Sequence, residues 1–173
     1  MTDHISHTRL GVFIVAAIAL LVALAISLGG GNTFRKKVTV ETYFDESVQG
    51  LDIGSKVRYR GVVIGAVSSI NFTYTRYELD KSLSDRKQYV LVEMAVYPEL
   101  LGTHGGDDDF VGKLVADGLR IRMAPIGITG IAYLELDFSP RAAVLPVRWQ
   151  PANLYIPSVR STVLNFVDAA ERI

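Results

Sequence analysis

The fold is decided by the stretch Val48-Gln-Gly-Leu-Asp-Ile-Gly-Ser-Lys-Val-Arg-Tyr-Arg-Gly-Val-Val-Ile-Gly-Ala-Val67. Within it, cationic and apolar side chains alternate in the order Lys56, Val57, Arg58, Tyr59 and Arg60. Because a period of two puts successive side chains on opposite faces of a strand, residues 56–64 are predicted to form one strand. We expect its cationic face to be an ordinary solvent-exposed face. The alternative is that this face contacts an anionic headgroup or an acidic neighbour. The glycines at 61 and 65 mark a tight turn or a bulge.

Four further segments are predicted to be strands, because they are rich in β-branched and aromatic residues. They cover residues 38–44, 89–97, 118–123 and 132–138. In the last of them, alternation places Leu134, Leu136 and Phe138 opposite Tyr133, Glu135 and Asp137. Polar or glycine-rich turns lie at 52–55, 61–65, 73–88 and 102–109. Short strands separated by such turns are typical of a small all-β barrel or sandwich.

An uncharged apolar segment of nineteen residues runs from Leu10 to Leu28. As a helix with ~1.5 Å rise per residue it spans roughly 28 Å, about one hydrocarbon core. We predict an uncleaved transmembrane helix over 10–28, a head at 1–9 and a linker at 29–37. The alternative is a signal peptide, since the small residues at 23 and 25 would suit a signal peptidase. The apolar run exceeds the usual ~7 to 15 residues of a signal peptide, which favours the anchor.

The charges beside this segment bear on its orientation. Arg9 precedes it, whereas Arg35, Lys36 and Lys37 follow it. The positive-inside rule by itself would place the N-terminus outside. That rule weakens for large translocated domains, so we predict a cytoplasmic N-terminus, a single pass through a bacterial inner membrane, and a periplasmic domain.

The end of the sequence has a different periodicity. Apolar residues recur at steps of four, three, four and three: Val159, Val163, Phe166, Ala170 and Ile173. This spacing is typical of an a/d seam, and it predicts an amphipathic helix beginning near Pro157, with either Ser158 or Ile156 as its N-cap. Two heptads are marginal in water, so the helix needs a partner, either its own barrel or neighbouring copies.

The composition excludes several kinds of chemistry. Eighteen Lys plus Arg balance eighteen Asp plus Glu, so no overall field favours nucleic acid. The chain has no cysteine, and its three histidines are His4, His7 and His104. The aspartates at 107–109 could suggest a cation site, but they lack the ligand spacing of an EF-hand loop and are interpreted as a solvated acidic loop. We therefore predict a protein that is not an enzyme, with no metal site and no cofactor.

One apolar segment is unusual between two predicted strands. It reads Met123-Ala-Pro-Ile-Gly-Ile-Thr-Gly-Ile131. One proline and two glycines disfavour a regular strand or helix in it. The segment must either fold under as part of the core or be displayed, and displayed apolar patches usually mark binding surfaces.

Two parts of the sequence resemble the MCE (mammalian cell entry) domain family. The stretch 48–67 carries Gly-Leu, Gly-Ser and the Gly-Val-x-x-Gly-x-Val turn of the family's opening signature. The stretch 119–136 is similar to the closing segment, where a strand leads into a short apolar loop, then a glycine and Tyr-x-x-Leu. The resemblance implies a seven-stranded β-barrel at 38–140, with an N-terminal transmembrane helix and a C-terminal connection and amphipathic helix at 141–173.

The resemblance also implies a function. MlaD-like members are subunits of ABC-type phospholipid transport systems, in which six copies form a ring around a hydrophobic pore. The pore-lining loop would then comprise Pro125, Ile126, Gly127, Ile128, Thr129, Gly130 and Ile131. Thr129 departs from the family, because Ile128 and Thr129 stand where two leucines are common. Expected partners are further copies of the chain, an ABC permease and ATPase, phospholipid and, where one exists, a periplasmic lipid carrier.

Two long segments and three rival functions remain open at the level of the sequence. The segments 73–88 and 102–109 are longer than a minimal domain needs and could contact a partner. The main rival is a membrane-fusion adaptor subunit of an efflux or secretion complex, which also combines an anchor with a barrel and helices. Such adaptors carry a long helical hairpin that this sequence does not show. An anchored hydrolase is disfavoured by the missing nucleophile and histidine features, and a structural adhesin would bind no lipid.

Overall fold

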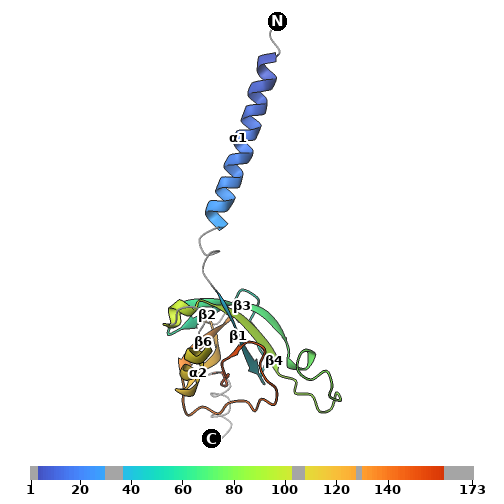
Figure 1. Ribbon diagram of the computed structural model, residues 1–173, viewed down its shortest axis with the longest axis vertical. Coiled ribbons are helices and arrows are strands. Elements are labelled where there is room, and N and C mark those ends of the chain that lie inside the picture. Colours follow the sequence, from blue (N-terminus) through green and yellow to red (C-terminus); the bar gives the residue numbers. More distant parts are fainter. Residues whose placement is uncertain (1–3, 30–36, 103–107, 128–129, 162–173) are drawn as a thin grey trace. The chain divides into compact units, whose positions relative to one another are not determined.

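The structure is a computed structural model that describes residues 4–29, 37–102, 108–127 and 130–161. The chain divides into two compact units, residues 1–35 and residues 36–173. The first unit contains α1, and the second contains the sheet and the shorter helices (Figure 1). Each unit is described by itself below.

Helix α1 runs from His4 to Gly29 and confirms the predicted helix, with several more residues at its N-terminal end. Leucine, alanine and isoleucine dominate it, and no proline interrupts it. Its described apolar side chains, such as Phe13 and Leu21, are exposed within their own unit. Within the described part of the chain, no helix has both the length and the apolar character that a membrane span requires, so the predicted span at 10–28 is not confirmed.

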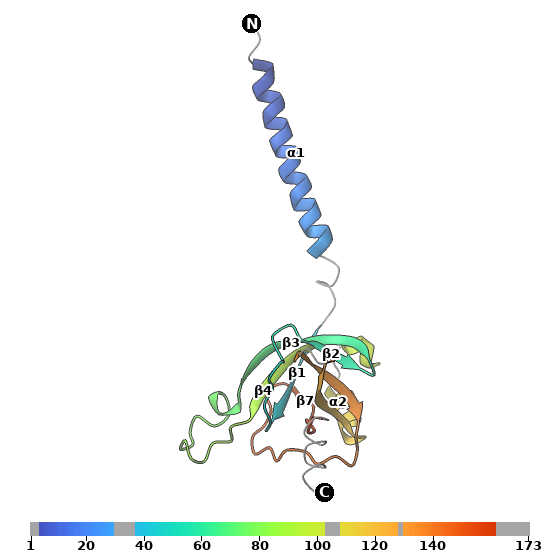
Figure 2. The ribbon, with the colours of Figure 1, turned by 180° about the vertical axis from the view of Figure 1, so that it is seen from behind.

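The second unit is built on a seven-stranded mixed sheet that curls around the core (Figure 2). The strands are β1 (Val38–Phe44), β2 (Lys56–Tyr59), β3 (Val62–Phe72), β4 (Val90–Val96), β5 (Leu119–Pro125), β6 (Ala132–Phe138) and β7 (Leu154–Tyr155). Their order in the sheet is β5-β6-β2-β3-β4-β1-β7. The pairs β2–β6 and β1–β7 are parallel, and the other neighbouring pairs are antiparallel.

The predicted strands 38–44 and 132–138 match β1 and β6 residue for residue. The prediction of one strand over 56–64 is wrong, because the chain reverses at Arg60 and Gly61 and forms the β2–β3 hairpin. Both turn residues have positive φ, 48° and 86°. A two-residue turn of this hand fits the twist of two antiparallel strands, which is why the alternation stops after Tyr59.

Residues 154–159, which include the edge strand β7, link β1 to β5 at the opposite edge of the sheet. The Ile156 amide donates to the Glu41 carbonyl on β1 at 3.1 Å. On the other side, the Ile121 amide of β5 donates to the Pro157 carbonyl at 3.0 Å. The same short segment therefore pairs with both edges of the curled sheet, and it buries Ile156 completely.

This linking segment corrects the predicted start of the C-terminal helix. Ser158 forms a parallel bridge with Ile121 and donates its side-chain hydroxyl to the Tyr43 carbonyl. The Val159 amide donates to the Ile121 carbonyl at 2.8 Å, so the first residue of the predicted seam is not helical. Sheet pairing satisfies these backbone groups in place of a helix. The other seam residues, Val163, Phe166, Ala170 and Ile173, lie outside the described residues.

Three short helices connect the strands: η1 (Thr73–Thr75), η2 (Pro98–Leu101) and α2 (Asp108–Ala116). The sequence predicted only an acidic loop at 102–109 and missed α2. The helix packs Val111, Leu114 and Val115 against the core. The core itself lies inside the curled sheet, where the fully buried residues include Ile64, Met94, Leu119, Ile121, Leu134 and Leu136.

Two glycines allow a matched test of the packing between β3 and β4. A Cβ on Gly65 would lie 2.3 Å from the Ala95 carbonyl oxygen of β4, whereas a Cβ on Gly112 of α2 would meet nothing within 4 Å. Gly65→Ala is expected to lower the free energy of unfolding by about 1–3 kcal/mol, because backbone must move. Gly112→Ala is expected to be neutral or to stabilise by up to about 1 kcal/mol. Denaturant unfolding of both variants measures this, and equal effects would contradict the packing described.

Candidate functional site: the β5–β6 hairpin and its loop

The apolar loop predicted from the sequence is the tip of the β5–β6 hairpin. The last strand pair is Pro125 with Ala132, and one step further out the Ile126 amide donates to the Ile131 carbonyl at 2.7 Å. Gly127 and Gly130 have φ values of 61° and 77°, in the left-handed region that favours glycine. Hairpin pairing thus continues to the base of the loop.

The described residues of the loop are displayed rather than folded under. Ile126 is 42% exposed and Ile131 is 53% exposed. Pro125, Gly127 and Gly130 are exposed as well. The predicted members Ile128 and Thr129 lie outside the described residues. Of the two alternatives that the sequence left open, the structure supports display.

Gly50 holds the base of the loop from the side. Its carbonyl accepts the Ala132 amide at 2.8 Å, and its φ is 86°. A Cβ at this position would lie 2.0 Å from the Gly130 carbonyl oxygen. Only glycine allows this approach, which fixes the hairpin tip to the turn that precedes β2.

A groove of about 360 Å³ lies beside the loop. Its apolar wall is formed by Met123, Pro125, Ile131 and Ala132, and its polar wall includes Glu46. The carboxylate of Glu46 accepts the Ser161 amide at 3.0 Å and the Ser161 hydroxyl at 3.1 Å. Burial raises the pKa of Glu46, although these two hydrogen bonds act in the opposite direction.

The outer face of the hairpin is charged, as the alternation predicted. Arg122 and Glu135 form an ion pair, with Nη2 2.8 Å from Oε2. The Arg58 guanidinium lies 4.9 Å from the centre of the Tyr133 ring. Leu134 faces the core and is fully buried. Of the predicted cationic side chains of β2, Arg58 therefore packs on its own sheet, which supports a structural role for it, whereas Lys56 is exposed.

A second polar site, which the sequence did not predict, lies between the sheet and the insertion 73–88. Glu41 on β1 is fully buried. Its carboxylate accepts the Tyr43 hydroxyl at 2.5 Å, the Tyr77 hydroxyl at 2.9 Å and the Asn153 amide at 3.1 Å. Burial and the hydrogen bond to Glu41 raise the pKa of Tyr43. The Tyr77 ring also stacks on Trp149, with ring centres 5.5 Å apart.

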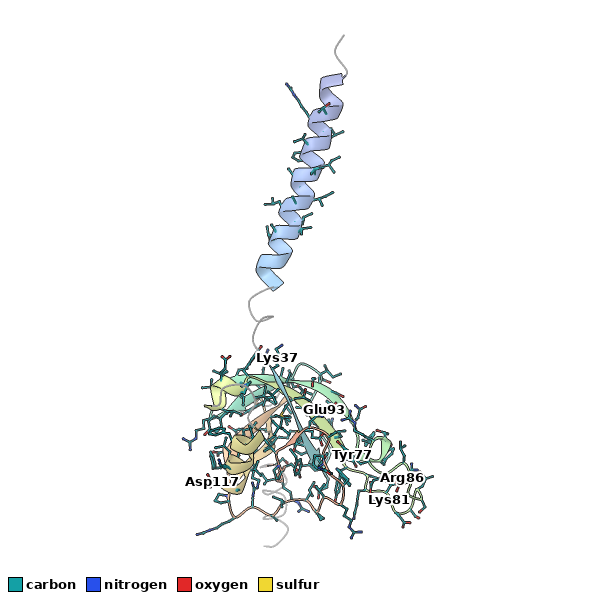
Figure 3. The ribbon with its side chains drawn as sticks, in the orientation of Figure 1. Lys37, Tyr77, Lys81, Arg86, Glu93 and Asp117 are labelled. Atoms are coloured by element: carbon teal, nitrogen blue, oxygen red, sulfur yellow. The ribbon has the colours of Figure 1, made fainter. Side chains whose placement is uncertain are left out.

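An ion pair adjoins this cluster. Arg76 of the insertion approaches Glu93 of β4, with Nη1 2.6 Å from Oε1. The hydrogen bond from Arg76 holds the pKa of Glu93 below its usual range. The signals for this site in the sequence are the glutamates inside the predicted strands 38–44 and 89–97. In Figure 3, Tyr77 lies at the base of the insertion, whereas Lys81 and Arg86 lie farther out.

The acidic loop interpreted at 102–109 is only partly described. His104 and Asp107 lie outside the described residues, and Asp108 begins α2. Within the described ranges, no group of three or more His, Cys, Asp or Glu side chains is arranged to hold a metal ion.

Comparison with known proteins identifies the family. The sequence model of MlaD, described as "MlaD protein", matches residues 36–139. The chain belongs to the MlaD family. This confirms the resemblance found in the sequence. The MlaD family is non-catalytic, so the chain is not an enzyme, as predicted.

A solved structure shows the same fold. One chain of the "Acinetobacter MlaFEDB complex in ATP-bound Vtrans1 conformation" superposes with a TM-score of 0.55 at 17% sequence identity. The match covers 96% of this chain and 98% of that chain. At this identity the likeness is evidence for the fold alone.

Two glycines with positive φ test the anchoring of the loop. Gly50→Ala is expected to displace the Gly130 carbonyl and to speed hydrogen exchange of the Ala132 amide, because the added Cβ meets backbone. Gly54→Ala is the control: its φ is 91°, but its Cβ would meet nothing within 4 Å. The control carries only the conformational cost, about 1–2 kcal/mol. Equal exchange rates at Ala132 in the two variants would contradict this anchoring.

The lowered pKa of Glu93 predicts a pH dependence. A carboxylate with a depressed folded-state pKa stabilises the fold above its unfolded pKa, and this contribution is lost as the pH falls through the folded-state pKa. The stability advantage of the native chain over Glu93→Gln should therefore be full at neutral pH and shrink below about pH 4.5. Thermal unfolding from pH 7 to pH 3 measures it. Glu99→Gln, on exposed η2, serves as the control, and an advantage unchanged down to pH 3 would refute the assignment.

Proposed function

We propose that this chain is the MlaD-like subunit of an ABC-type phospholipid transport system. Six copies form a ring, and their hairpin loops line a central hydrophobic pore that conducts lipid between the inner and outer membranes. Membership of the MlaD family supports this proposal. The solved Acinetobacter chain of the same fold belongs to an MlaFEDB complex in an ATP-bound conformation, which supports an ATP-driven assembly. The family match also favours lipid transport over the membrane-fusion adaptor.

The observation that carries the proposal is the display of the apolar loop. The exposed side chains of Ile126 and Ile131 stand on a hairpin that Gly50 fixes at its base. Exposing apolar area costs roughly 25 cal/mol per Å², and apolar groups displayed together usually mark a binding surface. A lipid tail is a ligand of the required chemistry.

A ring turns this short loop into a conduit. Each CH₂ of an acyl chain costs about 0.8 kcal/mol to keep in water, so a path between two membranes must be continuously apolar. Cyclic symmetry repeats the loop residues 125–131 around one axis. The groove beside the loop adds the apolar surface of Met123 and Ala132 to this path. The seam residues after 162 remain candidates for a helical bundle that extends it.

The membrane attachment belongs to the same proposal. Helix α1 presents exposed apolar side chains such as Leu10 and Val15 over its described length. We assign to it the attachment to a bacterial inner membrane, with residues 1–9 in the cytoplasm and the sheet domain in the periplasm. The partners are then an ABC permease and ATPase, and a periplasmic lipid carrier where the system has one.

Photocrosslinking tests the pore. A photoreactive amino acid at Ile131 should form phospholipid adducts in membranes, whereas the same group at Val144, exposed on the loop after β6, should form few. The mass of the detergent-extracted particle should equal six copies. Equal lipid labelling at both positions, or no lipid at Ile131, would refute the pore, and a monomeric particle would refute the ring.

A further inference from the structure

The insertion 73–88 displays large apolar side chains at the end of β3. Leu79 is 67% exposed and Leu83 is 79% exposed. Phe72, the last residue of β3, is exposed too and stacks on Tyr74 with ring centres 5.3 Å apart. A pocket of about 320 Å³ lies between these aromatic rings and Leu83. We call these four residues the insertion patch.

The insertion patch is held in shape. The Arg86 guanidinium donates to the Lys81 carbonyl at 2.9 Å and to the Leu79 carbonyl at 3.2 Å. Glu78 is fully buried and accepts the Lys87 amide at 2.7 Å. Together with the contacts of Tyr77 to the sheet, these bonds order the segment, so leucine exposure here is a built feature and not a fluctuation of a free loop.

A second exposed apolar group lies at the opposite end of the same strand. Val62 is 61% exposed, and Val63 beside it is exposed as well. Both follow the tight turn at Arg60 and Gly61. We call the two valines the turn patch. Strand β3 has 11 residues, which at ~3.3 Å per residue separates its two ends by up to roughly 33 Å.

The charges around the two patches are complementary. Within 78–88, Asp80 and Asp85 are exposed, whereas Lys81, Arg86 and Lys87 are half-buried. Lys81 pairs with Glu78, and Arg86 donates to a carbonyl of the insertion. Beside the turn patch, Arg60 is exposed in the turn itself. Exposed Lys37 lies over the ring of Tyr97, whose amide donates to the Ile64 carbonyl next to Val63, and exposed Glu99 follows on η2.

We propose that the insertion patch of one copy packs on the turn patch of the next copy, with Asp80 and Asp85 facing Arg60 of the neighbour. This interface rests on the proposed ring and names the surfaces that form it. Two different patches at opposite ends of one strand make a head-to-tail contact, the kind that closes into a ring when its rotation allows.

The absence of cysteine makes a direct test possible. A chain carrying both Leu83→Cys and Val62→Cys, treated in membranes with a short bismaleimide, should give a ladder of crosslinked species that ends at six copies. Each single variant should stay monomeric on a denaturing gel. Co-expressed single variants should give dimers and nothing larger, because each interface then joins one pair.

A matched control and the particle mass separate the possible outcomes. Leu83→Cys combined with Val144→Cys places the second thiol at another exposed position and should give no ladder. A particle of six copies without a ladder would overturn this interface and leave the proposed function standing. Dimers from Leu83→Cys alone would overturn it as well, since the insertion would then pair with itself. A monomeric particle would overturn the ring and the interface together.

Charge reversal gives an independent readout. Asp80→Lys with Asp85→Lys should lower the yield of the crosslinked ladder by about fivefold or more at low salt, as expected for lost ion pairs at an interface. Adding Arg60→Asp to the same chain should recover most of the yield. Arg60 has a φ of 48°, which aspartate tolerates better than most residues, so the turn should survive. No loss on reversal, or no recovery, would contradict the assigned pairing.

Discussion

The sheet domain depends on the backbone pairing of residues 154–159 with two strands at once. On one side Ile156 donates to β1, and on the other side Ile121 of β5 donates to Pro157. Without this segment, β1 and β5 would each expose unpaired amides and carbonyls, and the core beneath Ile156 would be open to water. The family match ends at residue 139, so a chain cut there would lack the segment that joins the two edges. The connection after β6 is therefore part of the fold.

A buried carboxylate joins β1 to the insertion 73–88 and to the connection before β7. Glu41 lies on β1, inside the apolar pattern, and its oxygens accept hydrogen bonds from Tyr43, Tyr77 and Asn153. A buried charge without such partners would cost several kcal/mol. These donors come from the strand itself, the insertion and the connection before β7, so one side chain holds three distant segments in place. The network explains how a long polar insertion can present exposed leucines on an ordered support.

Short-range sequence patterns predicted the elements whose form depends on neighbouring residues in the chain. β-Branched and aromatic residues placed β1 correctly, alternation placed the two faces of β6, and a proline with two glycines marked the hairpin loop. Gly61 marked the tight turn correctly, but the strand was carried through it because an arginine at positive φ leaves no signal in a strand-like run. Helix α2 was missed because glycine and aspartate precede its apolar residues. The burial of Glu41, the approach of Gly50 to Gly130 and the pairing of Val159 each depend on residues far away in the chain, which no window of sequence contains.

The exposed apolar groups of the domain differ in a way that fits two separate tasks. The hairpin loop combines isoleucines with proline and glycine on a tip that Gly50 holds in place, which suits the proposed lining of a pore. The insertion patch instead presents long leucines and stacked rings, which fill a complementary surface well. A conduit must stay open to successive lipids, whereas an interface between copies must be covered permanently. Gly50 holds the hairpin loop in place, and Tyr77 holds the insertion patch. One sheet can therefore display both apolar groups without either folding into the core.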